Sequence, residues 1–393
     1  MSAARVGIIG AGAAGTSAAR LLHTQAPEIE VELFARTGEK PANRTLVTKG
    51  VMSGLLEPDQ ATLPDTGASL VSDTVRGLDP RTRELRLDSG ATRMFDALII
   101  ASGSRPRLLD EDILGRDEAL HSGRLTTLHS MADGARVRDR LASRPASRVL
   151  LLGGGILASE AASLLTDAGH DVALIARSLV PGANAIGAHA ARRVLDLHHP
   201  QHAAYLGVNP RAIRTHPDRI SITLDRSGTK VDGDLAIVAH GTLPAAPAPW
   251  TGPDGIPVDS RLRSMHAPRQ RIYAAGGVAV HHYPGHSSYR IDHWDDSVAQ
   301  GAHAAKTLLH DLGLDDDPGI YLPSSPFSAR VHGHTLVGAG YPALGSSTQI
   351  VSADPLLTAH YLGDTLVALT GIDATGLVRD WIPRLHRRAP TRP

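Results

Sequence analysis

Three glycines near the start of the chain are spaced so that they could bind a pyrophosphate. Gly10, Gly12 and Gly15 have the G-x-G-x-x-G spacing and directly follow an apolar run at 6–9. In such a strand-to-helix turn the first glycine permits the tight turn, the second lets the phosphates approach the backbone, and the third lets the helix pack on the strand. The helix N-terminus then points at the phosphates. The motif predicts dinucleotide binding, with a glycine-rich turn that binds nothing as the alternative.

The same pattern nearly recurs in the middle of the chain. Gly153 and Gly155 follow the apolar run 149–152, and Ala158 stands where the third glycine would be. A residue as small as alanine is tolerated there. Two such motifs in one chain strengthen the dinucleotide interpretation of both.

The elements that must position these turns are short buried strands and helices. Runs of this kind are typical of parallel sheets in α/β proteins. Beyond the runs at 6–9 and 149–152, strands are expected at 31–34, 95–101, 172–175, 235–238 and 271–274, and helices after Gly15, at 157–168 and at 291–312. Other segments predict a loop at 38–56, antiparallel strands within 68–88, a connector with one helix (131–141) at 108–146, and linkers at 245–257 and 318–326. Towards the end, strands are expected at 336–337, 349–351 and 366–369 and an amphipathic helix at 377–385.

Composition limits the class of protein. The chain has 393 residues, of which 42% are hydrophobic, and Lys+Arg and Asp+Glu both total 40. This length suggests about two to three domains, and the balanced charge indicates neither nucleic acid nor a membrane as partner. The count of zero cysteines excludes disulfides, thiolate metal sites and a redox-active thiol. With no leader and no long apolar run, we expect a soluble, cytoplasmic protein.

Three blocks in chain order resemble the two-dinucleotide-binding flavoproteins of the pyridine nucleotide-disulfide oxidoreductase fold, in their ferredoxin reductase branch. The blocks are 10–15, A-S-G-S-R-P-R at 101–107 and I-Y-A-A-G at 272–276. The resemblance implies an α/β fold with two Rossmann-like three-layer domains, the NAD domain inserted in the FAD domain, and a small α+β C-terminal domain. The implied boundaries are 1–110 with 245–320 for FAD, 111–244 for NAD(P)H and 321–393 for the C-terminal interface domain.

Two charged residues match the branch at its flavin ring. R-T-L-V-T-K at 44–49 aligns with the branch's R-P-P-L-S-K, and Glu160 aligns with the glutamate that pairs with its lysine. The resemblance implies that Lys49 and Glu160 act on the flavin, where a cation stabilises negative charge on the reduced ring. The alternative is two unrelated surface charges.

The resemblance also implies a larger set of cofactor-binding residues. They are Gly10, Gly12, Ala14, Gly15, Ala35, Arg36, Arg44, Lys49, Val75, Ala101, Ser102, Gly103, Gly153, Gly155, Ile156, Ala176, Arg177, Ser178, Gly241, Gly276, Gly277, His293 and Trp294.

Several anchors of the family are missing. Ala35 stands where an acid normally binds the ribose hydroxyls, and Gly277 stands where a second acid binds the ribityl chain. The branch's connector arginine is replaced by Thr126, with Arg124 displaced by two positions. A charged hydrogen bond contributes about 1.5–3 kcal/mol. These losses predict weaker flavin binding unless Arg36 or backbone groups compensate.

The second dinucleotide unit also lacks its ribose acid. Ala176 occupies that position and is followed by Arg177 and Ser178. Without a carboxylate to repel a 2′-phosphate, and with an arginine beside it, NADPH is favoured over NADH. NADH binding, or a degenerate site that binds neither, are the alternatives.

The chain has 21 histidines. One Gly/Pro-containing loop contains His281, His282 and His286, followed by His293, and a second group near Pro200 contains His198, His199 and His202. We interpret both groups as polar surface residues, with an acid–base or acceptor-docking role of the first as an alternative. The spacing H-H-Y-P-G-H matches no standard metal motif, so no metal site is expected.

These observations lead to one function hypothesis and two alternatives. The first is a FAD-dependent NAD(P)H oxidoreductase that passes electrons to a ferredoxin-like protein or small-molecule acceptor without a redox cysteine. The second is a cofactor-degenerate scaffold subunit, and the third is a flavoenzyme acting on an organic substrate. The C-terminal domain forms dimer contacts in related families, which implies a homodimer here.

Overall fold

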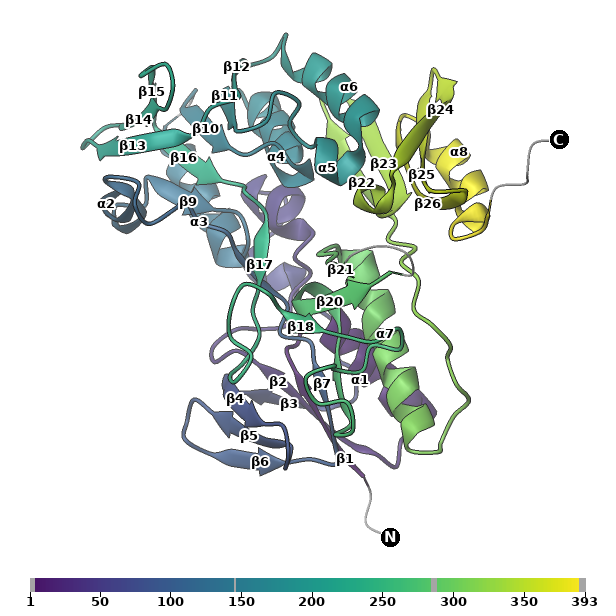
Figure 1. Cartoon of the computed structure of the whole chain (residues 1–393). Coiled ribbons are helices and arrows are strands. Elements are labelled where there is room, and N and C mark those ends of the chain that lie inside the picture. The colour runs from purple at the N-terminus through teal and green to yellow at the C-terminus, as the bar shows by residue number, and fades with distance from the viewer. Residues whose placement is uncertain (1–3, 145, 284–287, 389–393) are drawn as a thin grey trace, which may run out of the picture. The chain divides into compact units, whose positions relative to one another are not determined.

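The computed structural model describes residues 4–144, 146–283 and 288–388 (Figure 1). Contacts within the chain divide it into two compact units. The first unit comprises Met1–Asn43, Ala61–Arg105 and Thr242–Ser325, and the second comprises Arg44–Gln60, Pro106–Gly241 and Pro326–Pro393. Each unit contains one parallel sheet.

The first unit is centred on a five-stranded sheet with the order β19-β7-β1-β2-β3. Its strands are β1 (Arg5–Ile9), β2 (Glu30–Ala35), β3 (Ser69–Ser72), β7 (Ala97–Ile100) and β19 (Ile272–Ala274). All neighbours run parallel, and every side chain of β7 is buried, as expected for a strand covered on both faces. The strands expected at 6–9, 31–34 and 271–274 are confirmed. Antiparallel strands are expected within 68–88, and Val75–Asp79 and Glu84–Leu87 do pair antiparallel; Ser69–Ser72 instead extends the parallel sheet beside β2.

Two helices and a small antiparallel sheet share the core of this parallel sheet. Helices α1 (Ala13–Gln25) and α7 (Trp294–Asp311) pack together, and Ser17 Oγ donates to the carbonyl oxygen of Val298 at 2.8 Å. Strands β4 (Val75–Asp79), β5 (Glu84–Leu87) and β6 (Thr92–Met94) form the antiparallel sheet, and β4 and β5 add Leu78, Leu85 and Leu87 to the core. Shorter strands of this unit are β18 (Ile256–Pro257), β20 (Ala279–His282) and β21 (Ser288–Tyr289).

The second unit repeats the same topology, with the strand order β12-β11-β10-β16-β9. The strands are β9 (Leu125–Thr127), β10 (Arg148–Leu152), β11 (Asp171–Ala176), β12 (Ala203–Leu206) and β16 (Leu235–Val238), all parallel. In both sheets the central strand, β1 or β10, leads into the glycine turn. One edge strand, β19 in the first sheet and β9 in the second, lies outside the stretch of chain that supplies the other four strands. The sequence did not reveal β9, which lies in the segment predicted as a connector with a single helix.

Alternate residues of β10 enter two different cores. Val149 and Leu151 pack with helices α3 (Met131–Ala142) and α4 (Ile156–Asp167). Leu150 and Leu152 pack with the antiparallel strands β13 (Pro210–Thr215), β14 (Ile220–Leu224) and β15 (Lys230–Gly233). The three layers are therefore helices, parallel sheet and antiparallel sheet, and the predicted Rossmann-like α/β fold is confirmed.

The C-terminal segment forms a five-stranded antiparallel sheet with the order β22-β23-β26-β25-β24. Its elements are β22 (Phe327–Val331), β23 (His334–Gly340), β24 (Ser347–Ala353), β25 (Leu356–Leu362), β26 (Thr365–Ile372) and helix α8 (Thr375–Trp381). Helices α5 (Ala183–Ile186) and α6 (Ala188–His198) pack on it through a cluster that includes Val194, Val331 and Ile372. The three strands and the final helix expected here are confirmed.

Two segments contain more structure than the sequence indicated. The connector 108–146 contains α2 (Arg116–His121) and β9 as well as α3. The expected loop at 38–56 includes a π-helical turn, η1 (Val47–Met52). These elements are too short to show a hydrophobic period, and β9 is held by pairing with β16, which is distant in sequence.

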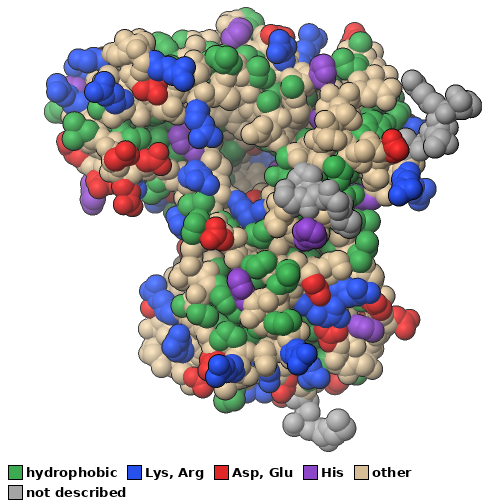
Figure 2. All heavy atoms as spheres, viewed as in Figure 1, with side chains coloured by type: hydrophobic (Ala, Val, Ile, Leu, Met, Phe, Trp, Pro, Cys, Tyr) green, Lys and Arg blue, Asp and Glu red, His purple; other side chains and the backbone are tan. Residues whose placement is uncertain are grey.

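The surface shows no dominant sign of charge on the face drawn in Figure 2, where basic and acidic side chains are interspersed. This agrees with the net charge of zero. Among the described residues, no helix is both long enough and apolar enough to cross a lipid bilayer.

Candidate functional site

The first glycine turn has the geometry of a phosphate-binding loop. Gly10 has a φ of +109°, and a Cβ there would overlap the carbonyl of Ala101. A Cβ on Gly15 would overlap the carbonyl oxygen of Gly10. Gly12, the N-cap residue of α1, instead has no heavy atom within 4 Å of its Cβ position. The open space therefore lies at the helix N-terminus, where backbone N–H groups lack intrahelical partners and a pyrophosphate would bind.

Two further loops meet this turn. Ser102 follows β7, its Cα lies beside Gly10, and its hydroxyl is buried without a hydrogen-bond partner in the described part of the chain. Gly276 follows β19 with a φ of +76° and lies against Ala14 in the first turn of α1. The unpaired hydroxyl beside the turn is therefore available to hydrogen-bond a polar ligand.

A carboxylate that the sequence did not reveal lies at Gly277. The Asp292 side chain occupies the space that a Cβ of Gly277 would need. Thr242 Oγ1 donates to Asp292 Oδ2, and Arg290 Nη1 lies 3.5 Å from the same oxygen. Arg290 also donates to the carbonyl oxygens of Gly277 and Thr242, at 2.8 and 2.7 Å. The acid missing at position 277 is thus replaced in space by one from position 292.

A buried polar network from α7 holds the loop after β19. Asp296 is fully buried and accepts hydrogen bonds from Gln300 Nε2 at 2.5 Å and from the Tyr321 hydroxyl at 2.7 Å. Gln300 Oε1 in turn accepts from the backbone N–H of Gly276 at 2.6 Å. Burial disfavours the charged carboxylate and raises the pKa of Asp296 to about 6. Sequence reasoning missed Asp296 and Tyr321, since they meet only through the fold.

The other residues expected at the flavin lie near the ends of these elements. Ala35 is buried at the end of β2, and the exposed Arg36 lies 3.7 Å from Glu39. Val75 begins β4 and is half-buried. The remaining two, His293 and Trp294, form the N-cap and first residue of α7 and are half-buried.

The second glycine turn repeats the first. Gly153 has a φ of +137°, and a Cβ there would overlap the carbonyl oxygen of Ala239. Gly155 is the N-cap residue of α4 and has open space at its Cβ position, followed by Ile156. Ala158 is fully buried in place of the third glycine. The helix N-terminus of α4 is therefore open to a second pyrophosphate.

The last residue of β11 and the two residues after it form the predicted ribose end of this second site. Ala176 is buried, whereas Arg177 and Ser178 are exposed. The Arg177 guanidinium has no hydrogen bond or ion pair with any described residue. The pKa of His240 is lowered, first by the burial of His240 and second by the charge of Arg177. Gly241, with a φ of +82°, also has open space at its Cβ position. An uncommitted guanidinium at this place suits a phosphate.

Lys49 and Glu160 both belong to the second unit. The expected ion pair between them is not formed in the described structure; Thr48 Oγ1 donates to Glu160 Oε2 at 2.6 Å, and Lys49 is exposed on η1. Arg44 is exposed, and its Nη1 lies 2.8 Å from His129 Nε2. Arg124 is occupied elsewhere, since its guanidinium donates to the carbonyl oxygens of Asp234 and Pro217.

The histidine predictions need correction. His281 is only 4% exposed on β20, stacks on Tyr289 and is not a surface residue, whereas His282 is exposed. Burial lowers the pKa of His281 to about 4. His286 lies outside the described residues. Near Pro200, His199 is exposed as predicted, but His198 and His202 are 2% and 8% exposed. Tertiary packing, which has no signature in the local sequence, buries both rings.

A family model for pyridine nucleotide-disulphide oxidoreductases matches residues 4–301. The chain therefore belongs to this family, as its resemblance indicated. The ferredoxin–NAD(+) reductase component of the anthranilate 1,2-dioxygenase system from Burkholderia cepacia is 28% identical over 374 residues, covering 90% of this chain and 86% of the relative.

Solved structures share the fold. The putidaredoxin reductase–putidaredoxin complex has a TM-score of 0.87 at 18% identity, covering 99% of this chain and 94% of that chain. An engineered water-forming NADPH oxidase bound to NADPH has a TM-score of 0.78 at 19% identity, covering 97% of this chain and 91% of that one. Its engineered substitutions convert a consecutive Asp-Ala-Met into Ala-Arg-Ser.

Proposed function

We propose that this protein is a FAD-dependent NAD(P)H oxidoreductase that passes electrons to a ferredoxin-like protein without a redox cysteine. The observation that carries the proposal is the pair of glycine turns, each with open space at the N-cap of a helix, at Gly12 and Gly155. Two dinucleotides in one chain of this family fit a flavin and a nicotinamide cofactor. The name of the Burkholderia relative, a ferredoxin–NAD(+) reductase component, supports the acceptor.

The first unit would hold FAD. The N-terminus of α1 would bind the pyrophosphate at Gly12, and the buried hydroxyl of Ser102 would gain a partner. Asp292, fixed by Thr242 and Arg290, would supply the carboxylate that Gly277 lacks. Bound FAD supplies hydride acceptance and electron release, which no side chain of this cysteine-free chain provides.

The second unit would hold NADPH in preference to NADH. Ala176, Arg177 and Ser178 remove the acid that binds a free ribose hydroxyl and add a guanidinium for a 2′-phosphate. The same three residue types in a row were engineered into the oxidase that is bound to NADPH. The exposed Arg177, with no partner among the described side chains, supports this assignment.

Lys49 and Glu160 would act on the flavin ring as the family resemblance implies. Glu160 is already oriented by Thr48, and Lys49 is exposed and has no ion pair with a described residue. Lys49 would therefore be available to stabilise negative charge on the reduced flavin. The cytoplasmic location, the homodimer and the three domain boundaries stay predictions.

The visible spectrum of the purified protein tests the proposal. We expect a yellow protein that releases FAD, and not FMN, on denaturation. Under nitrogen, NADPH should bleach the flavin faster than NADH, and an added [2Fe–2S] ferredoxin should restore the colour. Rapid reoxidation by a small organic molecule but not by ferredoxin would favour a flavoenzyme acting on an organic substrate. A colourless protein that takes up no added FAD would favour the scaffold alternative.

A further inference from the structure

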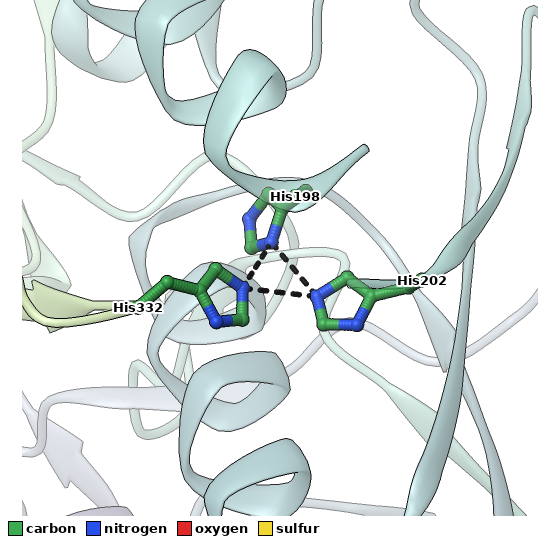
Figure 3. A group of neighbouring side chains, drawn as sticks. All are labelled: His198, His202 and His332. Carbon is green, nitrogen blue, oxygen red and sulfur yellow. Dashed lines mark hydrogen bonds between the residues drawn. The ribbon is translucent and has the colours of Figure 1, made fainter. Parts of the chain in front are cut away.

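Three imidazole nitrogens of the second unit meet at one point (Figure 3). His198 Nδ1, His202 Nε2 and His332 Nε2 form a triangle in which each pair lies 3.0 Å apart. His198 and His202 are buried and His332 is half-buried. None of these residues belongs to either glycine turn.

Separate elements bring the three rings together. His198 ends α6, and the backbone N–H of His202 donates to its carbonyl oxygen at 3.0 Å, so their side chains are one helical turn apart. His332 lies in the tight turn between β22 and β23, with a φ of +48°. Its backbone N–H donates to Ser163 Oγ of α4 at 2.8 Å, which fixes the turn beside the other two rings.

The outer contacts fix the protonation of one ring. The Thr166 hydroxyl donates to the carbonyl oxygen of Ala162 at 2.9 Å, so its oxygen must accept from His202 Nδ1, 3.3 Å away. The proton of neutral His202 is therefore on Nδ1, and the lone pair of Nε2 points into the triangle. This arrangement, a ring whose outer N–H is held by a protein oxygen, is typical of metal-binding histidines.

Hydrogen bonds alone cannot satisfy all three ring nitrogens of the triangle. If His198 and His332 both donate to His202 Nε2, two N–H groups are left facing each other at 3.0 Å. If only one of them donates, the nitrogen of the other ring and His202 Nε2 face each other with two lone pairs. Since a ring nitrogen carries either a proton or a lone pair, no assignment makes three hydrogen bonds, whereas one cation accepts all three lone pairs.

We propose that His198, His202 and His332 bind one divalent transition metal ion, with Zn²⁺ as the first candidate. Three imidazoles without a carboxylate favour Zn²⁺, Cu²⁺ or Ni²⁺ over Mg²⁺ or Ca²⁺. Tetrahedral Zn²⁺ at about 2.05 Å from each nitrogen needs nitrogens about 3.3 Å apart, so each ring would move outward by only about 0.2 Å. A fourth position is left for water or an external ligand.

The ion would connect the β22–β23 turn to the end of α6. His332 comes from the C-terminal sheet, while His198 and His202 lie more than a hundred residues earlier in sequence. Binding to the folded state alone would therefore stabilise the docking of this sheet on α6. The role is structural and independent of the proposed redox function.

Metal binding by the untagged full-length protein tests the proposal. After dialysis against EDTA and then buffer, ZnCl₂ titration by calorimetry and metal analysis after gel filtration should give one ion per chain. A concentration of free Zn²⁺ about a hundredfold above the dissociation constant should raise the Tm by about 5 °C. Flavin content and NADPH oxidation by the wild type provide a separate readout, so that failure here does not bear on the proposed function.

Matched variants separate the site from adventitious binding. His332→Asn removes the ligand but keeps a residue that tolerates positive φ, and should abolish the specific ion and the Tm rise. Thr166→Val should weaken binding about tenfold or more through the lost outer hydrogen bond. His199→Ala, at an exposed neighbour, should bind as the wild type does. Equal binding by wild type and His332→Asn, or no binding by wild type, would overturn the proposal.

Discussion

Arg177 and Arg36 occupy the same place in two similar units, directly after the second strand of each, but their surroundings differ. Arg36 lies 3.7 Å from Glu39, whereas Arg177 has no partner among the described residues and perturbs the nearby His240. An arginine with a carboxylate beside it is partly neutralised, while an unpaired one attracts a phosphate. This difference makes Arg177 the better candidate for discriminating the 2′-phosphate of NADPH.

Replacing Arg177 should therefore change the choice of nicotinamide. We expect Arg177→Ala to raise KM for NADPH by about 10–100-fold, equivalent to about 1.5–3 kcal/mol for a charged hydrogen bond, and to leave KM for NADH nearly unchanged. Steady-state reduction of ferricyanide with each nucleotide measures both values. The control Arg36→Ala should keep the NADPH-to-NADH ratio of the wild type. A ratio unaltered in Arg177→Ala would contradict the assignment.

Asp292 is a proposed flavin-binding residue whose position beside Gly277 appears only in the fold. Asp292→Asn keeps the size of the side chain but removes its charge and its ion pair with Arg290. We expect FAD affinity to fall about tenfold or more, measured by the quenching of FAD fluorescence on titration with apoprotein. Asp295→Asn, at an exposed acid in the first turn of α7, three residues further along the chain, is the control and should bind FAD normally. Identical affinities of the two variants would show that Asp292 does not contact the flavin.

Helix α7 links the loops of the first unit through buried polar and close-packed contacts. At its N-terminal end the network of Asp296, Gln300 and Tyr321 holds the backbone of Gly276. Directly after Gln300, a Cβ on Gly301 would overlap the carbonyl of Ala14 in α1. Helix α1, whose N-terminus is the proposed phosphate site, is thus positioned by α7.

The buried carboxyl of Asp296 should give stability a pH dependence. Its folded pKa of about 6 lies above the unfolded value near 3.9, so its favourable contribution is complete below about pH 4 and is lost as pH rises through about 6. Relative to Asp296→Asn, the wild type should lose up to about 3 kcal/mol of unfolding free energy between pH 4 and pH 7. Urea unfolding of both proteins across this range measures the difference. A difference that does not vary with pH would mean that Asp296 titrates normally.

The crossing of α1 and α7 predicts a steric effect. Gly301→Ala should destabilise the first unit by about 1–3 kcal/mol, because the new methyl group forces the two helices apart. Gly376→Ala, in α8, is the matched control: its Cβ position has open space, and stability should change by no more than about 1 kcal/mol. Thermal unfolding compares the two. A Tm of Gly301→Ala at or above that of the control would argue against tight packing here.

Taken as a whole, the molecule contains the same parallel sheet twice, each with its own glycine turn. Gly12 has φ −85° and ψ −162°, and Gly155 has φ −79° and ψ −176°, extended backbone that alanine also adopts. An added methyl group at either position would not strain the chain but would fill the space for a phosphate. The two units should therefore lose their ligands separately.

The paired variants test that separation. Gly12→Ala should fold but purify with much less FAD, whereas Gly155→Ala should keep its flavin colour and its reduction by dithionite. Flavin reduction by NADPH in Gly155→Ala should be slower by about tenfold or more, as for the loss of at least one charged contact. Anaerobic stopped-flow absorbance measures both steps. Loss of FAD from Gly155→Ala would contradict the assignment of the two turns.

Local sequence determined the parts of this protein that depend on backbone geometry and hydrophobic pattern. The spacing of Gly10, Gly12 and Gly15, the buried runs and the order of the three family blocks predicted both dinucleotide turns and the α/β fold. Such features are readable because positive φ, close helix–strand approach and burial each restrict the residue types at neighbouring positions. The presence of Arg177, and the lack of an acid at this end of the strand, can likewise be read from the local sequence.

Only the tertiary structure decided which distant residues share a site. It placed the Asp292 carboxylate at Gly277, added β9 to the second sheet and joined His332 to His198 and His202. It also left Lys49 without the expected ion pair to Glu160. None of these contacts has a signature in the local sequence, because each depends on the folding together of segments that lie far apart in the chain.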